Sequence, residues 1–140
     1  MSTAYYALFH LLVEETGRRF APARPARLRA RVRRALAHAD MRIVCQQFAG
    51  GRRARLGVGA QELTSDPLEP QLVRVAQTFV LLQAARHQAD YDTARIFGRL
   101  EVTPIVDRAE RALHDWRAVR ARPNAVVFLA ALLLQGRWNR

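Results

Sequence analysis

At 140 residues the chain is long enough for one domain with a single hydrophobic core. Half of its residues are hydrophobic, which argues against disorder of the whole chain. It carries 23 basic and 12 acidic residues, a formal net charge of +11, and every basic residue is an arginine. This charge favours an anionic partner. The absence of lysine has two explanations. Either guanidinium groups are used because they suit phosphate contact, or a GC-rich genome encodes arginine at positions where lysine would serve equally well.

The sequence gives no indication of a disulfide, a metal site or a membrane segment. Cys45 is the only cysteine, so we interpret it as a packing residue of a protein in a reducing cytoplasm. There are too few histidine, cysteine and acidic clusters for a metal site, and we expect no cofactor. Residues 1–10 lack the features of a signal peptide, and the apolar run 125–134 is about half as long as a membrane span. The chain is therefore predicted to be soluble and cytoplasmic, with no membrane partner.

Helical periodicity begins at the amino terminus, and strand signals are nearly absent along the chain. A first helix is predicted over residues 2–16. A second is predicted over about 26–48, where apolar residues recur at spacings of three and four. Residues 50–66 contain four glycines and predict a long loop, in which Gly57-Val58-Gly59 supplies turns.

A third helix has the clearest start. Asp66 can cap it, Pro67 can occupy its first position, and Glu69 can complete a capping box. Its apolar face runs from Leu68 to Leu82, at the spacing of one helix face.

Two more helices are predicted towards the carboxyl terminus. Thr103-Pro104 opens the fourth, which carries an Asp107–Arg111 pair on its solvent side. Asn124 caps the fifth, residues 125–135, which is apolar all round and so belongs at the centre of a bundle or in a subunit interface. We therefore expect one domain, residues 1–140, folded as an all-α up-and-down bundle of about five helices.

Cationic residues form a stripe on the predicted second helix: Arg27, Arg31, Arg34, His38 and Arg42. At 100° per residue they fall within about 80° of one helix face, beside the apolar stripe. The stripe is either a track for a phosphate backbone, and so a candidate nucleic-acid-binding surface, or a solvated face that happens to be basic. A track of this kind would give affinity without sequence specificity.

Arg86 continues the centre of the third helix's apolar face, and Asp90 lies one turn further along. An arginine at a core-facing position must be paired, hydrated in a cleft, or both. Either Arg86 and Asp90 form a structural ion pair with Tyr91 packed over it, or Asp90 orients Arg86 in a pocket that receives an anionic group.

The histidines give weaker signals. His10 lies one turn after Tyr6, so both could line one cleft, although a histidine on an aromatic helix is also common as a core residue. His87 is adjacent to Arg86 but about 100° around the helix, so it should face elsewhere. His114 is predicted to lie on the surface.

Two segments carry a family resemblance: Ser-Thr-Ala-Tyr-Tyr-Ala-Leu-Phe-His at 2–10 and Arg-His-Gln-Ala-Asp-Tyr-Asp at 86–92. Together they resemble the HEPN superfamily of small helical, often RNA-directed proteins, in particular its stand-alone bacterial and archaeal branch. Many HEPN proteins are metal-independent endoribonucleases that work as dimers, with a composite site in the subunit cleft. The resemblance therefore implies an RNA partner, a homodimer and a toxin or defence role.

The resemblance also implies roles for particular residues. Arg86 would bind the scissile phosphate, Asp90 would orient Arg86, and Tyr91 or His10 would assist. The family signature is an arginine separated by four to six residues from a histidine, and here those positions hold Tyr91, Asp92 and Thr93. If the chain cleaves RNA, His10, His38 or Tyr91 must move the proton.

Relatives normally carry another helix before the Tyr-Tyr motif, which here starts at residue 2. Either the native start lies upstream of Met1 or the chain lacks that helix and leaves apolar surface for a partner. The alternative function is a non-catalytic helical interaction module, such as the partner of a nucleotidyltransferase-like protein. A DNA-binding helical protein is the weakest hypothesis, because the loop between the second and third helices is too long for a helix-turn-helix.

Overall fold

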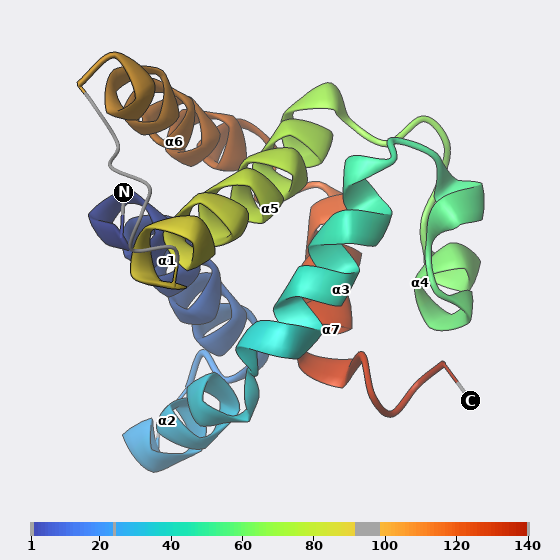
Figure 1. Cartoon of the computed structure of the whole chain (residues 1–140). Helices are drawn as coiled ribbons and strands as arrows, with labels where there is room; N and C mark the ends of the chain where they lie inside the picture. The colour runs from blue at the N-terminus through green and yellow to red at the C-terminus, as the bar shows by residue number, and fades with distance from the viewer. Residues whose placement is uncertain (1, 24, 92–98, 140) are drawn as a thin grey trace.

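A computed structural model describes residues 2–23, 25–91 and 99–139. These residues form seven α-helices, one short 3-10 helix and no strand, so the predicted all-α bundle is confirmed with seven helices in place of about five (Figure 1). The elements are α1 (Ser2–Phe20), α2 (Ala26–Ala35), α3 (His38–Ala49), η1 (Arg53–Arg55), α4 (Val58–Leu63), α5 (Pro70–Tyr91), α6 (Arg99–Val119) and α7 (Pro123–Leu134). None of the described helices is both long enough and apolar enough to cross a membrane.

The core lies around α5. This helix packs against α3, α6 and α1, while α7 packs against α1 and α3 (Figure 1). The predicted apolar face of the third helix is buried along its whole length, from Leu68 to Leu82. Phe128 of α7 lies 4.9 Å from Phe48 and 6.1 Å from Trp116, measured between ring centroids. The apolar α7 therefore contributes to the centre of the bundle, one of its two predicted places.

The predicted second helix is broken into α2 and α3. The backbone is extended at Leu36 (φ −77°, ψ 125°) and at Ala37 (φ −112°, ψ 138°), where Leu36 turns into the core. No residue of α2 is buried, and α2 packs on α1, whereas α3 packs on α5 and α7. A straight helix over 26–48 would be about 35 Å long and could not follow both surfaces. The break places His38 and Arg42 on a different helix from Arg27, Arg31 and Arg34.

The capping residues predicted for two helices serve longer-range contacts. α5 begins at Pro70, not at Pro67, and the Asp66–Pro67 peptide bond is cis. The backbone N–H of Arg53 donates to Asp66 Oδ1 (3.3 Å), so the predicted capping box is not formed.

Asn124 lies inside the first turn of α7, where it joins two segments far apart in the sequence. It accepts a hydrogen bond from the Ser65 backbone N–H and donates to the Ser65 carbonyl, both at 2.9 Å. It also donates to Glu69 Oε1 (2.8 Å). The predicted cap at Asn124 is therefore wrong, and Arg122 holds the N-cap position.

The segment predicted as a long loop contains η1 and α4. Arg53 Nε of η1 donates to the Gln61 carbonyl of α4 (2.7 Å), and this hydrogen bond connects the two elements. Gly57 is the N-cap of α4 and Gly59 is buried within it, where a Cβ would lie 2.8 Å from the indole of Trp138. The carboxyl-terminal residues therefore cover α4, a contact that local sequence does not reveal.

α6 also differs from its prediction. It begins at Arg99, so Thr103 and Pro104 lie inside the helix. Within the part of the chain that the structure describes, Asp107 and Arg111 form no ion pair.

Candidate functional site

Arg86 lies where α5 packs against α1. Its Cζ is 5.3 Å from the ring centroid of Tyr5 and 4.8 Å from that of Tyr6, within the range of cation–π contact. The arginine is half-buried, as its place at the end of an apolar face predicted. Its guanidinium is thus positioned by the tyrosine pair of the first sequence motif.

His38 joins the same tyrosine from a third helix. Its Nδ1 is 2.6 Å from Tyr5 Oη, and its ring stacks on Phe9 at 4.0 Å and 3°. As the first residue of α3, His38 reaches α1 because the chain turns at Leu36 and Ala37. The helix break that divides the basic stripe also builds this contact.

Gln83 completes the contacts of Tyr5. It lies three residues before Arg86 on α5, and its Nε2 is 3.5 Å from both Tyr5 Oη and the His38 carbonyl. Its Oε1 is buried without a hydrogen-bond partner. Rotation of the amide exchanges donor for acceptor beside Tyr5, so the tyrosine can either donate to His38 or accept from it. Both histidine tautomers are therefore compatible with this geometry.

Burial favours the neutral form of both ring groups. Burial lowers the pKa of His38 below its ordinary 6.5, and the charges of Arg86 and His10 act in the same direction. Burial also raises the pKa of Tyr5 above 10.0, opposed by the Gln83 hydrogen bond and the charge of Arg86. At neutral pH the pair is consequently a neutral imidazole and a protonated phenol.

His10 is exposed, so its interpretation as a core residue is wrong. Its ring stacks against Tyr6 at 6.0 Å and lies edge-on to Phe9 at 5.4 Å. It therefore extends the same group of rings towards solvent. We call Tyr5, Tyr6, Phe9, His10, His38, Gln83 and Arg86 the aromatic–histidine cluster.

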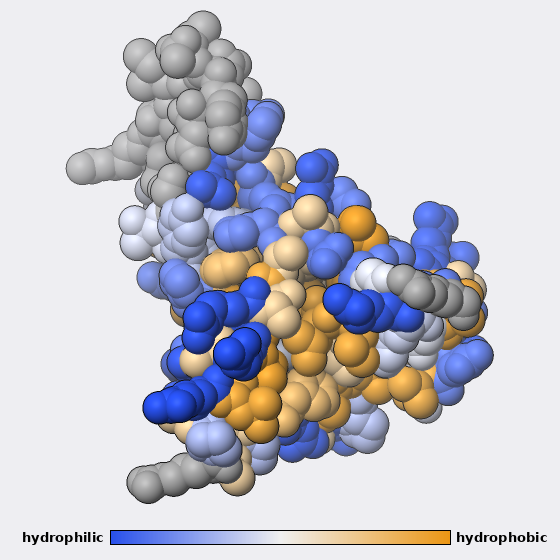
Figure 2. All heavy atoms as spheres, turned by 90° about the horizontal axis from the view of Figure 1, so that it is seen from below, coloured by the Kyte–Doolittle hydropathy of each residue, from blue (hydrophilic) through white to orange (hydrophobic). Residues whose placement is uncertain are grey.

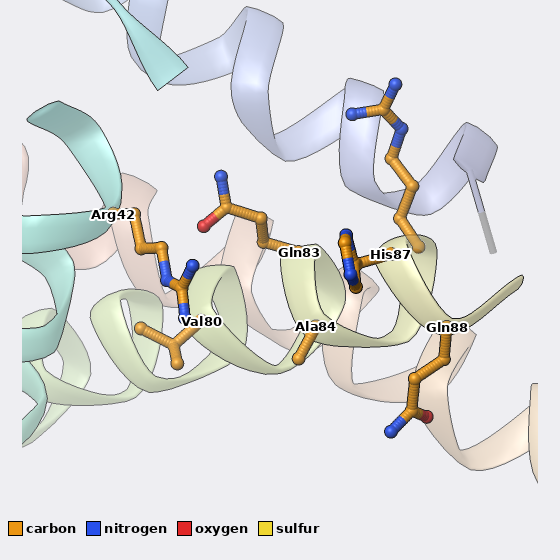
Figure 3. Close-up of a pocket in the computed structure, with 7 residues that line it drawn as sticks. Arg42, Val80, Gln83, Ala84, His87 and Gln88 are labelled. Atoms are coloured by element: carbon orange, nitrogen blue, oxygen red, sulfur yellow. The ribbon is translucent and has the colours of Figure 1, made fainter. Parts of the chain in front are cut away.

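An open pocket of about 430 Å³ adjoins this cluster between α3 and α5 (Figure 3). It is lined by Arg42, Val80, Gln83, Ala84, Arg86, His87 and Gln88. Figure 3 shows Arg42 reaching from α3 towards Val80 on α5. His87 was expected to face away from Arg86, but the pocket is wide enough to include both side chains. Two cations from different helices thus line one hollow.

The other predicted residues are not gathered here. Arg27, Arg31 and Arg34 are exposed on α2. The side chains of Asp90 and Tyr91 lie outside the described part of the chain, and with them the predicted Arg86–Asp90 arrangement.

Two arginines that the sequence did not single out hold α2 on α1. Arg29 donates to the carbonyls of Ala21 (3.0 Å) and Pro22 (2.7 Å). Arg33 pairs with Glu14 at 2.9 Å. Part of the basic surface is therefore structural.

Sequence reasoning also missed the roles of Tyr5, Phe9 and Gln83. The two aromatic residues lie in the first motif, and Gln83 could have been found as a polar residue one turn before Arg86. Cys45 is fully buried and burial raises the pKa of its thiol, as expected for a packing residue. Among the described residues no group of three or more histidine, cysteine or acidic side chains could hold a metal ion.

Comparison of the chain with family models, curated proteins and solved structures gave no match.

Proposed function

We propose that the chain is an RNA-directed protein and that the aromatic–histidine cluster is a metal-independent endoribonuclease site. The observation that carries the proposal is that Arg86 and a neutral His38 contact the same tyrosine beside an open pocket. A cation for phosphate and a group that exchanges protons near neutral pH are the two requirements of metal-free RNA cleavage.

Each residue has a defined task in this reaction. His38 Nε2 accepts the proton of the ribose 2′-OH. With the Gln83 amide rotated from its observed donor orientation, His38 Nδ1–H donates to Tyr5 Oη and the phenol donates to Gln83 Oε1. The 2′ oxygen then bonds to phosphorus and the bond from phosphorus to the 5′ oxygen breaks. The products are a 2′,3′-cyclic phosphate and a 5′-hydroxyl. Arg86 stabilises the charge that develops on the phosphorane oxygens, and His10 supplies the proton for the leaving oxygen.

The exposed rings would position the substrate. Tyr6 is 36% exposed and His10 is exposed beside it, so an unstacked base can pack on this pair. Arg42 extends the positive charge across the pocket from α3. Arg27, Arg31 and Arg34 would contact the phosphate backbone further along the strand.

The HEPN resemblance supports this proposal and suggests a homodimer with a toxin or defence role. HEPN nucleases carry a histidine where this chain has Tyr91, Asp92 and Thr93. We propose that His38, from α3, takes its place. Tyr5, which belongs to the motif that carries the resemblance, is the residue that connects His38 to Arg86.

The same substitution favours a second candidate function. Without the family's histidine, the chain would be a non-catalytic helical module, such as the partner of a nucleotidyltransferase-like protein. In that case Arg86 would recognise an anionic group without promoting its cleavage.

The test is cleavage of end-labelled structured RNA in excess EDTA by the purified wild type and by His38→Gln and Arg86→Gln. Because general acid–base and electrostatic terms are each worth about 100-fold or more, each variant should lose at least that factor. His114→Gln and Arg117→Gln change exposed residues of α6 and should retain activity. Circular dichroism confirms that each variant is folded.

Failure of the folded wild type to cleave RNA would contradict the nuclease proposal. Cleavage that survives both His38→Gln and Arg86→Gln would contradict the assigned site. RNA binding that Arg86→Gln weakens, without cleavage by the wild type, would support the non-catalytic module.

A further inference from the structure

A second group of arginines lies between α5 and α6, away from the aromatic–histidine cluster. At its base Arg74 forms a two-bond pair with Asp115: Nε donates to Oδ2 and Nη2 donates to Oδ1, both at 2.9 Å. The side chain of Asp115 is 7% exposed and that of Arg74 is 46% exposed. The carboxylate thus has both oxygens engaged and fixes a guanidinium whose outer edge reaches solvent.

Two further arginines line the same pocket, of about 220 Å³. Arg108 and Arg111 lie three residues apart on α6, on the helix face that also carries Asp115. Both are exposed, and within the described residues neither forms a hydrogen bond or an ion pair. Gln77 and Thr78 of α5 supply the neutral polar lining.

The charge of this pocket is not balanced. Three arginines face one carboxylate, and that carboxylate is fully used by Arg74, so the lining carries an excess of two positive charges. Cations held together without acidic partners repel one another, and an anion between them removes the repulsion. Guanidinium groups bind phosphate oxygens with paired hydrogen bonds, which a halide cannot form.

We propose that the pocket formed by Arg74, Arg108 and Arg111 binds a phosphoryl group. Arg74 would serve as the fixed donor and the other two arginines would close on the ligand. Thr78 would donate to a remaining oxygen, whereas Gln77 lines the pocket and its Nε2 donates to the Ala49 carbonyl (3.2 Å). The ligand is either free phosphate or the phosphate of a nucleotide, because the arginines recognise the group that both share.

This site is separate from the aromatic–histidine cluster. Arg74 and Arg86 are twelve residues apart on α5, which corresponds to about 18 Å along the helix and about 120° around it. Phosphate binding here therefore does not depend on RNA cleavage at the cluster.

Isothermal titration calorimetry with inorganic pyrophosphate at low ionic strength tests the site. To remove the proposed phosphate contact of the aromatic–histidine cluster, all proteins carry Arg86→Gln. We expect binding to one site in this background and a loss of about tenfold or more in affinity when Arg108→Gln/Arg111→Gln is added, since two charge-assisted contacts are removed. The matched control, Arg117→Gln/Arg137→Gln, removes two exposed arginines outside the pocket and the same net charge. Its affinity should change less than about twofold, the effect of net charge alone.

Inorganic phosphate and a nucleoside 5′-monophosphate then identify the ligand. Tighter binding of the nucleotide, lost in Arg108→Gln/Arg111→Gln, would assign the site to a nucleotide phosphate; equal binding would assign it to the phosphoryl group alone. Equal weakening in both double variants, or no saturable binding by the folded Arg86→Gln protein, would overturn the proposal. RNA cleavage by Arg108→Gln/Arg111→Gln, with Arg86 intact, is measured separately. Failure of the phosphoryl site leaves this cleavage unchanged, whereas failure of the nuclease proposal shows as no cleavage by the wild type.

Discussion

At the scale of single residues, Tyr5 connects the candidate site. It contacts Arg86 through its ring and His38 through its hydroxyl, and it is fully buried. Helical periodicity was enough to predict that Arg86 lies at the end of a core-facing stripe. His38 was one of three residues predicted to move the proton, but its contact with Tyr5 could not be predicted, because that contact depends on the helix break between Ala35 and His38.

The coupling between Arg86 and His38 is measurable. Burial and the charge of Arg86 both lower the pKa of His38, so Arg86→Gln should raise it while leaving it below 6.5. NMR of the His38 ring protons from about pH 4 to 8 measures this pKa. The range brackets the ordinary histidine value of about 6.5. Arg117→Gln removes an exposed arginine of α6 that is not part of the aromatic–histidine cluster or its pocket, and should leave the pKa unchanged. An unchanged pKa in Arg86→Gln would contradict the coupling.

The same pKa determines how the His38 contacts contribute to stability. Because folding lowers the pKa, the neutral imidazole is favoured in the folded state. The contribution is fully present above about pH 6.5, the unfolded value, and is lost as the pH falls through the lower folded value.

At the scale of helices, apolar faces were predicted well and helix ends were not. The face from Leu68 to Leu82 is buried as expected because its spacing alone determines which side meets the core. The helix ends were predicted wrongly because Asp66 and Asn124 form hydrogen bonds with distant segments and not with the ends of their own helices. The α2–α3 break was equally hidden, since the apolar spacing continues across it.

The contact between α4 and the carboxyl-terminal residues gives a prediction at this scale. Gly59→Val would place a side chain against the indole of Trp138. The nearest ring atom lies only 2.8 Å from the position of a Cβ at residue 59. We expect a loss of about 1–3 kcal/mol in unfolding free energy and greater acrylamide quenching of Trp138 fluorescence. Urea unfolding and quenching measure both effects. Trp116 is fully buried, so the change in quenching reports on Trp138.

Gly136→Val is the control, because a Cβ at residue 136 meets nothing within 4 Å. Its stability and quenching should stay close to those of the wild type. If Gly59→Val behaved in the same way, the packing of Trp138 on α4 would be contradicted.

At the scale of the whole molecule, the positive charge is divided among surfaces with different tasks. Arg29 and Arg33 fasten α2, Arg86 and Arg42 line the pocket beside the cluster, and a third group lies between α5 and α6. A net charge of +11 indicated an anionic partner, but composition cannot tell a structural arginine from a binding one. The structure makes that distinction by showing which protein groups each guanidinium contacts.

Hydrophobic side chains also reach the surface. Seen from below, they gather over the middle of one face and hydrophilic side chains surround them (Figure 2). Among the side chains that the structure describes, the exposed large hydrophobic residues are Tyr6, Phe20, Leu28, Ile43, Val58 and Leu63. The homodimer implied by the HEPN resemblance remains a prediction.

The central claim is that RNA binds at the aromatic–histidine cluster. Photocrosslinking of a 4-thiouridine-substituted RNA, followed by mass spectrometry of the crosslinked peptides, tests it directly and does not require cleavage. Crosslinks should fall on Tyr6, His10 or His38 and should be lost in Arg86→Gln. Crosslinks confined to the α5–α6 arginines or to α2, or a cluster pattern unaffected by Arg86→Gln, would contradict the claim.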